Sequence, residues 1–133
     1  MPGMDPFTRN RARTYPEASD PRLRGRRYGV EFAAVWRAVL AAAEASPRWS
    51  VVAADPVAGE LRAEARSRVW GLVDDVVVRV SLDEDALTRV DMESASRAGR
   101  GDLGANARRI ARFLGRLDAH LAATPPSPPL PER

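Results

Sequence analysis

Three stretches in the middle of the chain alternate between apolar and polar residues, which is the pattern of β-strands with one buried face. The alternation is cleanest over 60–67 and 75–81, and it returns over 90–93. The apolar run 49–54 precedes them and is followed by a turn sequence at 55–59, which contains aspartate, proline and glycine. We therefore predict four consecutive strands in this part of the chain.

Two other stretches repeat apolar residues at the spacing of an amphipathic helix. The first covers 30–45 and comes before the predicted strands, and the second covers 103–122 and comes after them. The second helix also has an arginine stripe, which we expect to face away from the core. It consists of Arg108, Arg112 and Arg116.

The order of these elements predicts the fold. Short turns between consecutive strands favour an antiparallel meander, and two amphipathic helices are available to cover its apolar face. We predict an α+β fold, a two-layer sandwich in which a four-stranded antiparallel meander carries both helices on one face, in the order αββββα. It would form a single domain over 30–123, after a mostly irregular basic segment at 1–29 and before a disordered proline-rich tail at 124–133.

The residue inventory excludes several chemistries. Without cysteine, the chain can form neither a disulfide nor a reactive thiolate. The single histidine, His120, leaves too few ligands for a zinc site. A Ser-His-Asp triad would also have to use His120, which lies far along the chain from the glycine-rich stretch 99–104. The sequence contains no phosphate-binding P-loop and no dinucleotide fingerprint. We therefore expect no metal and no cofactor.

No apolar run approaches the ~20 residues that a membrane-spanning helix needs. The N-terminus also lacks the continuous apolar core of a signal peptide. These two features predict a soluble, cytoplasmic protein.

All 21 basic residues are arginine, and the isoelectric point is 10.4. Residues 1–30 hold seven arginines against three acids, whereas 31–133 hold fourteen arginines against fifteen acids. Nucleic-acid binding requires a basic face on the folded domain, so this near-neutral balance disfavours a nucleic-acid partner. The expected partners are a small anion or phosphorylated metabolite, or another protein.

Polar residues with plausible specific roles gather around a predicted strand–loop–helix corner at 94–109. Glycine-rich sequence in the loop permits a tight turn, and Asp102 has the position of the N-cap of the last helix. Asn106 falls on the buried side of that helix, so its amide must be hydrogen-bonded. The candidate ligand-binding residues are Ser94, Ser96, Arg97, Asp102, Asn106, Arg109, Asp74 and Asp75.

Charge is segregated around this corner. Residues 74–93 hold seven acids and two arginines, whereas 97–116 hold six arginines and one acid. This pattern fits an internal salt-bridge network in which aspartates bind Arg97 or Arg109. It also fits an anion site, in which Arg97, Arg100 and the loop amides meet the positive end of the last helix.

Two functions remain open. The first is a non-catalytic binding or interaction module with an anion-binding corner at 94–109. The alternative is a metal-independent enzyme acting on a small anionic substrate, with Asp74 or Asp75 as acid/base and Arg97 and Arg109 as clamps. Strand alternation sends the two aspartates to opposite faces, which argues against an acid/base dyad.

Two runs, 74–80 and 91–110, resemble the paired signature of the bacterial and plastid family of domains of unknown function numbered 1499. The chain departs from the family pattern at Glu93, where arginine is usual, and at Gly101, where serine is common. The resemblance extends over about 15–121 and implies these domain limits and a shared polar cluster, but no reaction. The matching positions in the second run are Asp91, Ser94, Ser96, Arg97, Gly99, Asp102, Gly104, Asn106, Arg109 and Ile110.

Overall fold

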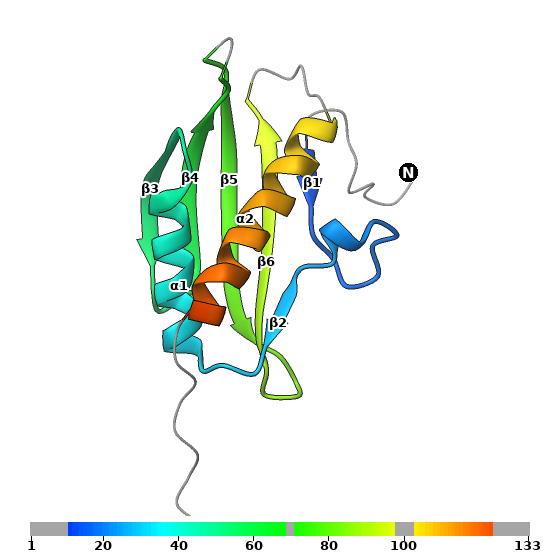
Figure 1. The fold of residues 1–133 in the computed structure, drawn as a ribbon, viewed down its shortest axis with the longest axis vertical. Coiled ribbons are helices and arrows are strands. Elements are labelled where there is room, and N and C mark those ends of the chain that lie inside the picture. Colours follow the sequence, from blue (N-terminus) through cyan, green and yellow to red (C-terminus); the bar gives the residue numbers. More distant parts are fainter. Residues whose placement is uncertain (1–10, 69–70, 98–102, 124–133) are drawn as a thin grey trace, which may run out of the picture.

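In the part of the chain that the structure describes, six antiparallel strands form one layer, and two α-helices cover one face of that sheet (Figure 1). The computed structural model describes residues 11–68, 71–97 and 103–123. The strands lie in the order β1-β6-β5-β4-β3, and β2 also pairs with β6. The described elements are β1 (Arg11–Arg13), the 3-10 helix η1 (Pro21–Leu23), β2 (Arg26–Tyr28), α1 (Phe32–Ala45), β3 (Trp49–Asp55), β4 (Glu60–Arg66), β5 (Val73–Leu82), β6 (Thr88–Ser96) and α2 (Leu103–Ala123).

The alternation in the central strands places their apolar side chains against the helices, as predicted. In the antiparallel register, Ala63 lies opposite Val76, and Val78 lies opposite Met92. All four side chains are buried. Both helices contribute their apolar stripes to the same core. The fully buried side chains include Val35, Val39, Ile110, Leu114 and Leu117.

The predicted antiparallel meander is present as β3–β6, but the sheet is larger than the predicted four strands, because β1 and β2 add two strands next to β6. Both strands lie within the segment 1–29, which was predicted to be mostly irregular. Each is only three residues long, Arg-Ala-Arg and Arg-Arg-Tyr, so no periodic apolar pattern can develop. This part of the chain also supplies buried core residues, including Ala12 and Leu23. One buried residue in β1, and none in β2, is too weak a sequence signal to distinguish a strand from a loop.

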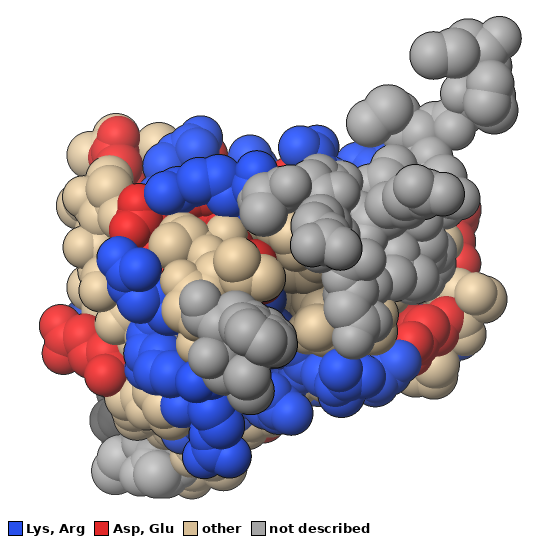
Figure 2. Space-filling view, turned by 90° about the horizontal axis from the view of Figure 1, so that it is seen from above, with Lys and Arg blue, Asp and Glu red and all other residues tan. Residues whose placement is uncertain are grey.

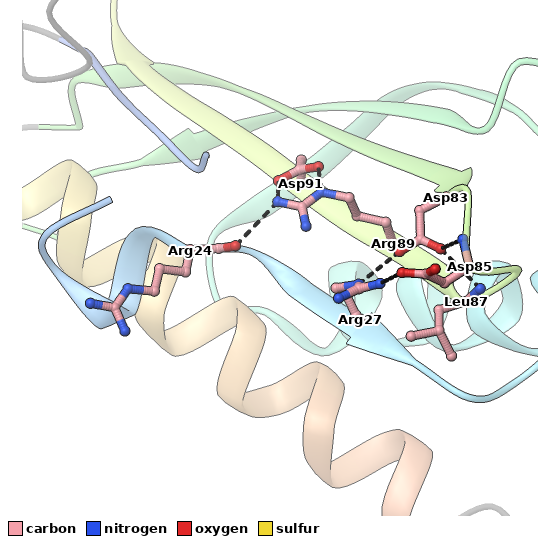
Figure 3. A network of polar contacts seen from close by, with 7 residues as sticks. All are labelled: Arg24, Arg27, Asp83, Asp85, Leu87, Arg89 and Asp91. Carbon is pink, nitrogen blue, oxygen red and sulfur yellow. Dashed lines mark hydrogen bonds and ion pairs between the residues drawn. The ribbon is translucent and has the colours of Figure 1, made fainter. Parts of the chain in front are cut away.

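Ion pairs hold β2 and the β5–β6 hairpin together (Figure 3). Arg27 donates to Asp83 at 2.7 Å and to Asp85 at 2.8 Å, and Arg89 donates to both oxygens of Asp91. Desolvation alone would raise the pKa of the Asp83 carboxyl, but hydrogen bonds from Arg27 and from two backbone amides lower it overall. Three further arginines of the described N-terminal segment, Arg11, Arg22 and Arg26, are also paired with acids.

One end of the sheet brings several connections together. The C-terminus of α1, the end of β4 and the start of α2 all lie at the top of the view in Figure 1. Within the described residues, neither helix combines the length and apolarity needed to cross a bilayer. The proline-rich tail predicted at 124–133 lies outside the described residues.

Candidate functional site

Five of the predicted site residues meet on the helix-covered face of the sheet, near the start of α2. In the strand register, Asp74 on β5 lies opposite Ser96 on β6. Two residues further along β5, on the same face of the sheet, Val76 lies opposite Ser94. Asn106 and Arg109 are three residues apart on α2, so they project from the same side of the helix. We call this group the Arg109 cluster. It consists of Asp74, Ser94, Ser96, Asn106 and Arg109.

The Arg109 cluster is a connected hydrogen-bond network. Arg109 Nη1 donates to Asp74 Oδ2 at 2.5 Å and to Ser94 Oγ at 3.1 Å. Ser94 Oγ donates to Asn106 Oδ1 at 2.7 Å, and Asn106 Nδ2 donates to Ser96 Oγ at 3.2 Å. Ser94 and Asn106 are fully buried, and Asp74 is nearly so. The network therefore satisfies buried polar groups and fixes α2 against β5 and β6.

Arg97 and Asp75 lie on the other face of the sheet, away from the Arg109 cluster. Arg97 Nη2 donates to Asp75 Oδ1 at 2.5 Å and to Glu64 Oε2 at 2.9 Å. The hydrogen bond to Asp75, followed by the bond to Glu64, raises the pKa of Arg97 above its usual range. Arg97 and Asp75 are about half exposed, so this is a surface network rather than a closed site.

The predicted corner is thus divided by the sheet into two groups. Asp74 and Arg109 form an ion pair on the buried face, and Asp75 and Arg97 form another on the exposed face. The predicted N-cap, Asp102, and the loop before it lie outside the described residues.

A groove next to the Arg109 cluster is lined by arginines that lie far apart in the sequence. It lies between α2, the turn from α1 to β3 and the end of β4, and its volume is about 480 Å³. Figure 2 looks onto this end of the molecule and shows blue arginine side chains gathered over much of it. We call it the arginine groove. Its arginines are Arg48, Arg66, Arg68, Arg108, Arg109, Arg112 and Arg116.

Arginine supplies all of the charged side chains in the described lining of this groove. The described lining includes no Asp or Glu, and the ion pair of Arg109 is with Asp74 in the adjacent cluster. Arg116 Nε is buried and has no hydrogen-bond partner among the described residues. By contrast, a second hollow near Gly25 is lined by both arginines and acids. The arginine groove therefore has a strongly positive lining.

The floor of the groove is aromatic and its edge has unusual backbone geometry. The Trp49 and Phe113 rings are stacked, with centroids 5.1 Å apart and planes 4° from parallel. The preceding residue, Arg48, has a φ of 63°. This left-handed conformation is uncommon for residues other than glycine, asparagine and aspartate, and such outliers concentrate at functional sites.

The sequence predicted one arginine stripe of the groove, but not where that stripe lies in the fold. Arg108, Arg112 and Arg116 recur at intervals of four residues, and this stripe was predicted to face away from the core. The fold turns the stripe towards the groove, where it meets Arg48 and Arg66. No local pattern links Arg48 and Arg66 to a helix that begins at Leu103, because antiparallel pairing of β3 with β4 and the packing of α2 bring them together.

The model of the family described as "Protein of unknown function (DUF1499)" matches residues 4–117. This match confirms the family that the runs 74–80 and 91–110 resemble, and it assigns no ligand or reaction. No curated protein matches the chain. Because the matched region covers most of the sequence, the chain belongs to the DUF1499 family of proteins of unknown function.

Proposed function

We propose that the protein is a non-catalytic binding module that holds a small anion in the arginine groove. The observation that carries this proposal is the lining of the groove, with seven arginines and, among the described residues, no Asp or Glu. A cleft lined by one sign of charge concentrates ions of the opposite sign. The volume of about 480 Å³ is within the usual range of small-molecule sites.

Arginine suits this role for geometric reasons. Its guanidinium is planar, stays charged at any physiological pH, and can donate two parallel hydrogen bonds to a carboxylate or phosphate. Arg112 and Arg116 lie one helical turn apart on α2, so their side chains emerge from the same face. An anion in the groove could therefore accept hydrogen bonds from neighbouring guanidinium groups.

This proposal moves the anion from the loop side of the corner to the adjacent groove. Arg97, on which the corner hypothesis depended, is already bonded to Asp75 and Glu64. Arg109 belongs to both regions, because it lines the groove and also bonds to Asp74. The Arg109 cluster would then act as a support that fixes one wall of the binding site.

The enzyme alternative receives less support from the geometry. It requires Asp74 or Asp75 to act on a substrate that Arg97 and Arg109 clamp together. Those two arginines lie on opposite faces of the sheet, each bonded to its own aspartate. One small substrate would not reach both arginines at once.

A thermal-melt titration with inorganic phosphate, at constant ionic strength, tests the proposed binding. A ligand that binds only the folded state raises the melting temperature in a saturable way. At ten times the dissociation constant, the stabilisation would be about 1.4 kcal/mol, or a rise of roughly 3–6 °C. We expect Arg112→Ala to remove this saturable rise.

Arg97→Ala is the matched control, because it removes the same charge from the exposed face of the sheet. It should keep the response of the parent protein. Phosphate also stabilises proteins weakly by exclusion from their surface, but that effect does not saturate and should persist in Arg112→Ala. A response that disappears in Arg97→Ala and persists in Arg112→Ala would contradict the proposal.

A further inference from the structure

The arginine groove has two basic walls that come from different parts of the chain. The helix wall is the face of α2 that carries Arg112 and Arg116. The strand wall carries Arg48, from the turn between α1 and β3, and Arg66, from the end of β4. Each wall thus contributes at least two arginines to the lining of the same hollow.

Two hydrogen bonds between Arg48 and Arg66 hold the strand wall in place. The amide of Arg66 donates to the carbonyl oxygen of Arg48 at 3.0 Å, and Arg48 Nε donates to the carbonyl oxygen of Arg66 at 3.3 Å. Arg48 adopts its left-handed φ of 63° at this point. Glycine would adopt that conformation without steric cost, so the presence of arginine supports a role for its side chain.

The stacked rings of Trp49 and Phe113 connect the two walls. Trp49 follows Arg48 on the strand wall, and Phe113 follows Arg112 on the helix wall. Because the ring planes lie only 4° from parallel, they join the walls through an apolar contact.

We infer that the ligand of the arginine groove carries two phosphoryl groups, one bound by each wall. This inference rests on the proposed function of the groove as an anion site. A phosphoryl group carries up to two negative charges and three acceptor oxygens, which match a pair of guanidinium groups on one wall. A single phosphate could engage one wall and would leave the other unneutralised. The two phosphoryl groups could belong to a soluble metabolite or to a lipid headgroup.

Isothermal titration calorimetry with inorganic phosphate and inorganic diphosphate tests this inference at constant ionic strength. We expect diphosphate to bind the parent protein at least about tenfold more tightly, as expected from added charge-assisted hydrogen bonds. Arg66→Ala on the strand wall and Arg112→Ala on the helix wall should each remove most of that advantage.

Arg62→Ala is the matched control for net charge. Arg62 is exposed on the same strand as Arg66, but it is bonded to Glu60 and is not among the residues that line the groove. If the higher charge of diphosphate alone explained its tighter binding, Arg62→Ala and Arg66→Ala would reduce the ratio of diphosphate affinity to phosphate affinity equally. That result would overturn the inference.

Arg48→Gly separates binding from folding. Glycine relieves the left-handed backbone, so this variant should melt at or above the temperature of the parent while binding diphosphate more weakly. Unchanged diphosphate affinity in a folded Arg48→Gly protein would count against the two-wall site.

The outcomes distinguish this inference from the proposed function. If phosphate binds saturably and diphosphate binds no better, the anion site stands and the two-phosphoryl ligand is wrong. If neither binds, both fail.

Co-sedimentation with phosphatidylcholine vesicles containing phosphatidylinositol 4,5-bisphosphate identifies the source of the phosphoryl groups. Retention that depends on Arg66 and Arg112 supports a lipid headgroup, whereas diphosphate binding without retention supports a soluble ligand.

Discussion

Gly59 shows how one residue fixes the turn between β3 and β4. Its φ is +70°, and a Cβ atom added there would lie 2.2 Å from the carbonyl oxygen of Val80. Its own carbonyl oxygen accepts a hydrogen bond from the Val80 amide at 2.7 Å. The position therefore requires both a left-handed backbone and the absence of a side chain. The sequence predicted a turn here, but the contact with β5 depends on the sheet.

We expect Gly59→Ala to cost more stability than Gly71→Ala. Gly71 also has a positive φ, but an added Cβ would meet none of the described residues within 4 Å. Gly71→Ala should cost about 1–2 kcal/mol of backbone strain. Gly59→Ala should carry that strain and a further ~1–3 kcal/mol from overlap with the backbone of β5. Urea unfolding of both variants measures the difference, and equal losses would refute the role assigned to the close approach.

At the scale of elements, the Arg109 cluster fastens α2 to the strands below it. Asn106 is central, because it accepts from Ser94 and donates to Ser96 while its side chain is fully excluded from solvent. Its buried position could be predicted from the helical periodicity. Its partners could not, because several polar groups near the corner were equally compatible with the sequence.

Replacing Asn106 with leucine should destabilise the fold by about 1–3 kcal/mol, since buried polar partners would lose their hydrogen bonds. Ala119→Leu introduces the same side chain at an exposed position of α2 and should change stability by less than about 0.5 kcal/mol. The free energies of unfolding of the two variants test this. If Asn106→Leu unfolds like the parent, the cluster does not fasten the helix.

Elements differed in how well the sequence predicted them. Alternation over 60–67 and 75–81 repeats often enough to predict a half-buried strand, and the helices have long apolar stripes. The three-residue strands β1 and β2 have no such repetition, and they are strands only because β6 offers them an edge. Similarly, Arg48 and Arg66 have no local sign of a shared role, because long-range pairing creates their side of the groove.

For the whole molecule, the distribution of charge matters more than the net charge of +3. On the exposed face of the sheet, arginines are paired with acids, as Arg11 is with Glu93 and Arg79 with Glu60. At the end of the molecule shown in Figure 2, the arginine groove lacks such acids among its described lining. A near-neutral domain thus presents one strongly basic hollow, which the balance of charges along the sequence conceals.

The most direct test of this account is a two-dimensional ¹H–¹⁵N NMR titration of the ¹⁵N-labelled protein with inorganic phosphate, because it locates the bound anion. We predict saturable shifts of the amide signals that line the groove, around 46–49, 65–68 and 105–116, which Arg112→Ala reduces. Shifts that saturate around Arg97 and Asp75 instead, or the absence of any saturable shift, would contradict the claim that the arginine groove is the anion site.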